Sequence, residues 1–230
     1  MLNILFVLMT KLIKLSQIRT FLIFWTIFLL PSHYSNSDVL NKITWKKDLT
    51  RGRIESYQIE VNENGQVTYQ FFPDQGEVVL VNLRLSSKKV DFLLDMFSKA
   101  DFLNKKKKFV SSRRVSSTGI NTIRLESGLQ QREIVFRYTE NKILKKIILF
   151  FNQLSQQEQS LFEMDIALRY DRLGILKRLD QLDRYLQRKE LIDPKRFIPV
   201  LEKISTDKSL INLAQKQARQ ILHQINNRTY

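Results

Sequence analysis

Residues 54–71 constrain the fold of this chain more than any other segment. Apolar Tyr57, Ile59 and Val61 alternate with polar residues, and the same period of two resumes after the pair Asn64-Gly65. Such alternation indicates strands with one buried face, and an Asn-Gly pair supplies the backbone conformations that a tight turn needs. We therefore predict a β-hairpin here, closed by Asn64 and Gly65.

Strand and helix signals continue up to residue 154. A third strand is predicted over residues 79–85, a serine-capped helix over 86–103, a second hairpin over 123–138 and another helix over 143–154. Together these segments predict an α+β domain over residues 38–154. Its small antiparallel sheet has about five strands, and its elements follow the order β-β-β-α-β-β-α.

Residues 155–230 carry only helix signals. Ser155 and Glu158 are spaced as a capping box at the start of a long helix, which the pattern bends at Gly174. Asp193-Pro194 and Thr206-Asp207 each predict the start of a further helix. We therefore expect a helical tail made of one long helix and a helical hairpin.

An apolar run without charges covers residues 20–30 and follows Lys11, Lys14 and Arg19. This order is typical of a signal peptide. At 1.5 Å per residue a helix of this run spans about 16 Å, well short of the roughly 30 Å hydrocarbon layer of a bilayer. Residues 1–37 are therefore predicted to be a signal peptide or a membrane anchor.

The small residues Ser35 and Ser37 occupy the positions expected before a cleavage at Asp38. Two alternatives stay open: translation can start at Met9, and the leader can remain uncleaved as an anchor in the inner membrane. Basic residues after the apolar run give no clean orientation. We expect an exported protein that resides in the periplasm or cell envelope, or is secreted.

Residue types that carry chemistry are scarce in this sequence. Cysteine is absent, and of the two histidines His33 lies near the predicted cleavage region and His223 in the last helix. Thiol, zinc-thiolate and Ser-His-Asp chemistry are therefore not expected. The six glycines form no phosphate-binding loop. We predict no cofactor and no metal site, and the one catalytic alternative is a pair of carboxylates.

Positive charge dominates the chain. It has 38 basic residues, three of them in the leader, against 23 acidic ones, so the net charge is +15 and +12 remains without the leader. Such an excess favours anionic partners such as lipid headgroups, and equally serves solubility alone. The candidate contact residues for an anionic surface are Lys105, Lys106, Lys107, Lys108, Arg113 and Arg114.

The four consecutive lysines repel one another, so we expect a loop that stays mobile without an anionic partner. Near an anionic leaflet each lysine contributes about 1 kcal/mol. The neighbouring Phe109 and Val110 are candidates for insertion into the membrane interface. A solvated loop without a partner is the alternative interpretation.

Two resemblances add to this picture. The hairpin Tyr57 to Tyr69 and the segment Phe92 to Phe102, with its final Ala-Asp-Phe, resemble a family of exported bacterial domains of unknown function over residues 43–154. These motifs fill core and turn positions, so the resemblance implies export and a fold but no chemistry. Residues 194–225 resemble a single helical pair of the HEAT type.

We predict from these observations a non-enzymatic protein of the cell envelope that binds a protein or an anionic surface. The alternative is an exported protease inhibitor or a carboxylate-dependent hydrolase. Nucleic acid is not an expected partner, because export argues against it and the basic residues form no aromatic stacking platform. No small-molecule ligand is implied.

Overall fold

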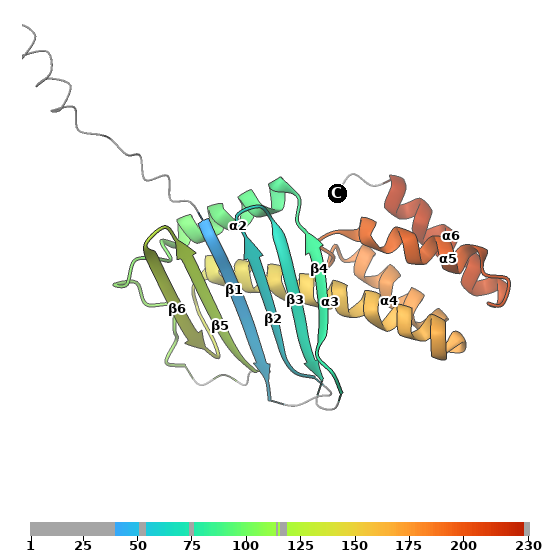
Figure 1. The fold of residues 1–230 in the computed structure, drawn as a ribbon, viewed down its shortest axis with the longest axis horizontal. Helices are drawn as coiled ribbons and strands as arrows, with labels where there is room; N and C mark the ends of the chain where they lie inside the picture. Colours follow the sequence, from blue (N-terminus) through green and yellow to red (C-terminus); the bar gives the residue numbers. More distant parts are fainter. Residues whose placement is uncertain (1–39, 51–53, 74–75, 114, 116–118, 228–230) are drawn as a thin grey trace, which may run out of the picture. The chain divides into compact units, whose positions relative to one another are not determined.

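A computed structural model describes residues 40–50, 54–73, 76–113, 115 and 119–227. In this part of the chain six antiparallel strands form one sheet, in the spatial order β4-β3-β2-β1-β5-β6. Helices α2 and α3 lie on one face of the sheet, and three further helices follow (Figure 1). The strands are β1 (Leu40–Leu49), β2 (Ile54–Asn62), β3 (Gln66–Pro73), β4 (Val79–Arg84), β5 (Gly119–Ser127) and β6 (Gln130–Phe136). The helices are α2 (Ser87–Ala100), α3 (Lys142–Tyr170), α4 (Ile175–Gln187), α5 (Ile198–Thr206) and α6 (Asn212–Asn227).

The predicted α+β class and the antiparallel sheet are confirmed, but the predicted number of five strands is wrong. Strand β1 was missed, although it lies at the centre of the sheet between β2 and β5. It has two fully buried apolar side chains, Ile43 and Trp45. Thr44 separates them, and lysines stand on either side of the pair. Two apolar positions are too few for a clear alternation, so the sequence pattern predicts no strand in this segment.

Alternate residues of the central strands point to the face that the helices cover. Trp45 of β1 lies opposite Ile59 of β2 and Ile123 of β5, and all three are fully buried. The Trp45 ring stacks on Phe151 of α3, with 5.6 Å between the ring centroids. The intervening side chains on the opposite face are mostly polar and part-exposed: Thr44, Glu60, Thr68 and Arg124.

The first hairpin is confirmed, but its turn is longer than the Asn64-Gly65 pair. Glu63, Asn64 and Gly65 form a three-residue loop, in which Gly65 has a φ of 72° and Asn64 does not have a positive φ. The Asn62 side chain holds this loop by accepting hydrogen bonds from the N–H groups of Asn64 and Gln66. A glycine is needed because a Cβ at residue 65 would press against α2.

Ser155 and Glu158 do not start a helix, so the predicted capping box is wrong. Both lie inside α3, which runs without a break for 29 residues after Asn141 caps its first turn. Both side chains are buried, and they contact other elements instead of the local backbone. The Ser155 hydroxyl lies 3.1 Å from the Tyr69 hydroxyl, and Glu158 accepts two hydrogen bonds from Arg196.

The predicted border between residues 154 and 155 falls inside α3. The buried apolar residues form two clusters: one joins the sheet to α2 and the first half of α3, and the other joins the end of α3 to α4, α5 and α6. Helix α3 contributes to both clusters, while residues 38–230 form one compact unit. The division into an α+β domain over residues 38–154 and a helical tail over residues 155–230 therefore stays a prediction.

The helical C-terminal region follows its apolar pattern. A 3-10 turn (η1, Arg172–Gly174) separates α3 from α4, so two helices lie where one long helix bent at Gly174 was predicted. Asp193 precedes a second 3-10 turn (η2, Pro194–Phe197), and α5 begins only at Ile198. The last helix begins at Asn212 and not at Thr206-Asp207, because Asp207 instead accepts two hydrogen bonds from Ser209 in a turn.

Across the described ranges, no helix combines the length and the apolar character that crossing a bilayer requires. The predicted leader, with His33 and the cleavage residues Ser35, Ser37 and Asp38, lies outside the described residues. Arg114 also lies outside them.

Candidate functional site

The basic loop, which we define as residues 101–113, begins where α2 ends. Asp101 adopts a left-handed conformation with a φ of 52°, and its N–H bonds back to the last turn of the helix. The chain then turns inward at Phe102, which is buried against Phe97 and Phe109. The loop therefore starts from a capped helix and an aromatic anchor.

Arg132 of β6 binds the backbone of this loop. Its guanidinium donates hydrogen bonds to three carbonyl oxygens: to Phe102 at 2.9 Å, to Lys107 at 2.6 Å, and to Asn104. The same group lies over the Phe109 ring, with 4.9 Å from Cζ to the ring centroid. One side chain thus fixes the path of six residues, and its charge is directed at carbonyl oxygens.

This arrangement argues against the mobile lysine loop that the sequence predicts, because Arg132 holds the backbone of residues 102–107. Lys105, Lys106 and Lys108 are exposed, and among the described residues no carboxylate lies within ion-pair distance of them. Lys107 differs, because its ammonium group contacts the Ala100 carbonyl oxygen at 3.3 Å and the Asp101 carboxylate at 3.6 Å.

The two apolar residues after the lysines have different positions. Phe109 is only 3% exposed and belongs to the core, so its predicted role in membrane insertion is wrong. Val110 is 55% exposed. Sequence reasoning could not separate them, because the partner of Phe109 is Arg132, which is 23 positions further along the chain.

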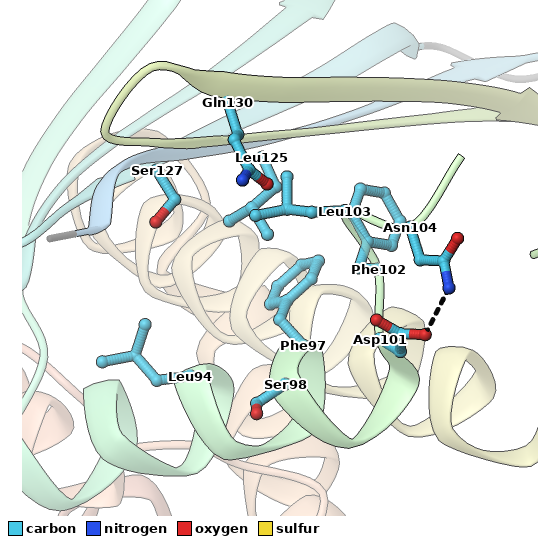
Figure 2. Close-up of a pocket in the computed structure, with 10 residues that line it drawn as sticks. All are labelled: Leu94, Phe97, Ser98, Asp101, Phe102, Leu103, Asn104, Leu125, Ser127 and Gln130. Carbon is cyan, nitrogen blue, oxygen red and sulfur yellow. Dashed lines mark hydrogen bonds between the residues drawn. The ribbon is translucent and has the colours of Figure 1, made fainter. Parts of the chain in front are cut away.

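A cavity of about 600 Å³ lies beside the start of the loop, between the end of α2 and the β5–β6 hairpin (Figure 2). Its lining mixes apolar side chains such as Phe97 and Leu103 with the hydroxyl groups of Ser98 and Ser127. The one lining carboxylate, Asp101, accepts a hydrogen bond from the Asn104 amide at 2.8 Å. The cavity can hold an apolar group with polar contacts, but its lining has no histidine that would activate a serine.

A second hollow, of about 550 Å³, lies at the other end of the loop. Three part-exposed or exposed valines, Val110, Val115 and Val135, line it together with Arg113 and Arg137. The N–H of Ser111 donates to the Tyr138 carbonyl oxygen and so joins the loop to the chain after β6. This end of the loop is both apolar and cationic.

A buried polar cluster lies on α3, away from the loop. Burial raises the pKa of Tyr69 well above its usual range, although the hydrogen bond with Ser155 lowers it in part. The Glu158 carboxylate is 1% exposed and is bound to Arg196 through Nε at 2.8 Å and Nη2 at 2.7 Å. The Glu158 charge thus has a partner within the fold. Because Tyr69 lies on β3 and Arg196 in η2, the cluster joins the sheet to the helical region.

Three other acidic residues of the helices form ion pairs at the protein surface. Asp95 pairs with Lys99, Asp165 with Arg169 and Glu163 with Arg178, each with a part-exposed side chain. His223 is exposed on α6, and Asn227 is the partner of its ring nitrogens. Within the described ranges no three histidine, aspartate or glutamate side chains are arranged to hold a metal ion.

The structure thus brings together Lys105, Lys106 and Lys108 in one ordered loop, with Arg113 at its far end. Arg132 was the functional residue that sequence reasoning missed. No family model matches this chain. The curated proteins likewise give no match.

Proposed function

We propose that this protein is a non-enzymatic binding module of the cell envelope whose basic loop contacts an anionic surface. The single observation that carries the proposal is the Arg132 contact with three loop carbonyls, which holds the loop while three of its ammonium groups have no carboxylate partner in the described part of the chain. A loop held in place loses little conformational entropy when it binds. The predicted leader supports a location next to lipid headgroups.

The lysines supply a measurable part of the binding free energy. At about 1 kcal/mol for each lysine near an anionic leaflet, Lys105, Lys106 and Lys108 together contribute about 3 kcal/mol, which is a factor on the order of 100 in affinity. Lys107 contributes less, because Asp101 already offsets its charge.

The test compares the full chain with the variant K105Q/K106Q/K108Q on vesicles of zwitterionic lipid, with and without anionic lipid. A matched control, K88Q/K195Q/K216Q, removes the same charge from the start of α2, from η2 and from α6. We expect the loop variant to lose about 100-fold in binding to anionic vesicles and the control to lose little. Equal losses in both variants would refute a specific role for the loop. Binding to zwitterionic vesicles measures the contacts that do not need anionic lipid, and it stays the same in all three proteins.

A further inference from the structure

The helical region exposes apolar side chains at two of its turns. Tyr170 and Leu173 stand at the turn between α3 and α4, with exposed fractions of 79% and 82%. Ile211 and Leu213 stand at the turn between α5 and α6, with exposed fractions of 48% and 61%. Their neighbours Ile175, Leu210 and Ala214 are buried, so the core of this region does not need the exposed four.

These two turns lie next to each other. Asp180 and Gln217 are each the sixth residue of their helix, and the Gln217 amide donates to the Asp180 carboxylate at 2.5 Å. Further along, Gln224 of α6 donates to Asp183 of α4 at 3.2 Å. Helices α4 and α6 therefore run in parallel and start at the same end of the helical region, as Figure 1 shows. We call the four exposed residues Tyr170, Leu173, Ile211 and Leu213 the helical tip.

The charges around the helical tip are unbalanced. Asp171 accepts a hydrogen bond from the Gly174 N–H at 3.0 Å, and Asp207 accepts two from Ser209, so both carboxylates serve the turns themselves. Hydrogen bonds from Ser209 lower the pKa of Asp207, and the positive charges of Arg172 and Lys203 lower it further. Among the described residues no carboxylate lies within 4 Å of Arg172, Lys203 or Lys208, and these three cations outnumber the two turn carboxylates, Asp171 and Asp207.

We propose that the helical tip inserts into the interface of an anionic phospholipid bilayer. Four side chains that project from two turns suit a fluid interface, and a tyrosine among aliphatic residues is the composition that membrane interfaces favour. The surrounding cations complement anionic headgroups. Insertion of the helical tip is a second membrane contact, separate from the basic loop of the proposed function. The tip and the basic loop lie near opposite ends of the 29-residue helix α3.

The absence of cysteine makes a direct test available, since one introduced cysteine carries a unique label. Full-length chains with Leu173→Cys or Leu213→Cys receive the fluorophore NBD, whose emission shifts to the blue in an apolar environment. Leu80→Cys is the matched control, because Leu80 is 53% exposed on β4 and belongs to neither the basic loop nor the helical tip. Each chain is mixed with vesicles that contain anionic lipid and, in a parallel sample, nitroxide-labelled lipid that quenches NBD.

We expect a blue shift and nitroxide quenching at residues 173 and 213, and neither at residue 80. Adding Leu213→Ser to the Leu173→Cys chain lowers the inserted fraction about tenfold, because burying one leucine contributes that factor or more. Adding Leu80→Ser changes nothing.

Labels at both tip positions that stay in water overturn the inference, as does a shift at residue 80 equal to that at residue 173. If the tip stays in water while K105Q/K106Q/K108Q still loses vesicle binding, the proposed function stands and only this inference fails.

Discussion

The contact between Glu158 of α3 and Arg196 of η2 can be removed from either side, and we expect the two single variants to lose different amounts of stability. The Glu158 side chain is 1% exposed, whereas Arg196 is 29% exposed. Arg196→Met keeps the stem but leaves a buried carboxylate with only the Gln157 amide, at 2.9 Å, as a partner. Breaking a buried ion pair in this way costs about 3–5 kcal/mol of unfolding free energy.

Glu158→Gln leaves the guanidinium instead, and that group already reaches water. Its expected cost is therefore smaller, about 1–3 kcal/mol. Because both changes remove the same contact, the double variant loses less than the sum of the single losses, by about 1–3 kcal/mol. The assay is equilibrium unfolding in urea, followed by circular dichroism, on all four proteins. Losses that add within about 0.5 kcal/mol, or a larger loss for Glu158→Gln than for Arg196→Met, would refute the reasoning.

Three further outcomes are expected. Arg132→Gln frees the backbone of the basic loop, so trypsin should cleave after Lys105 to Lys108 much faster than in the unmodified chain. The control is Arg188→Gln at an exposed helix end, which should leave the cleavage rate unchanged. Equal cleavage rates in the two variants would contradict the role of Arg132 in holding the loop. Burial raises the pKa of Tyr57 and Tyr69 above the ordinary value of 10.0. Their neutral side chains therefore contribute their full stabilisation below pH 10. This contribution is lost as the pH rises through the raised pKa values. Tyrosinate absorbance of the folded protein should then show two of seven tyrosines ionising late, and a single transition near pH 10 would contradict this. A fusion of residues 1–60 to a reporter that is active only outside the cytoplasm should be active, and a silent fusion would contradict the predicted export.

Local signals predicted the two hairpins, and they predicted that the chain after the sheet is helical. Tyr57, Ile59 and Val61 alternate clearly, and Gly65 marks the turn, so neighbours in the sequence were enough to define that hairpin. Strand β1 failed the same test, because Trp45 has its apolar partners on β2, β5 and α3 and none nearby in the chain. A central strand with two apolar residues is visible only once its neighbours are in place.

The candidate site was predicted in part. Composition alone indicated Lys105 to Lys108, but the order of the loop depends on Arg132, whose carbonyl partners lie 25 to 30 positions earlier. Glu158 was misinterpreted for the same reason: its spacing from Ser155 matches a helix start, while its actual partner Arg196 is 38 positions away. Long-range contacts of this kind leave no local pattern in a sequence.

The salt dependence of vesicle binding tests the role of the basic loop most directly. Between low and high ionic strength the Debye length falls from about 30 Å at 0.01 M to about 3 Å at 1 M, which screens exposed lysines but not apolar contacts. Binding of the unmodified chain to anionic vesicles should fall steeply over this range. Binding of K105Q/K106Q/K108Q should start about 100-fold weaker and fall far less. Two parallel curves of equal steepness would contradict the account, because the three unpaired lysines would then contribute nothing to the contact.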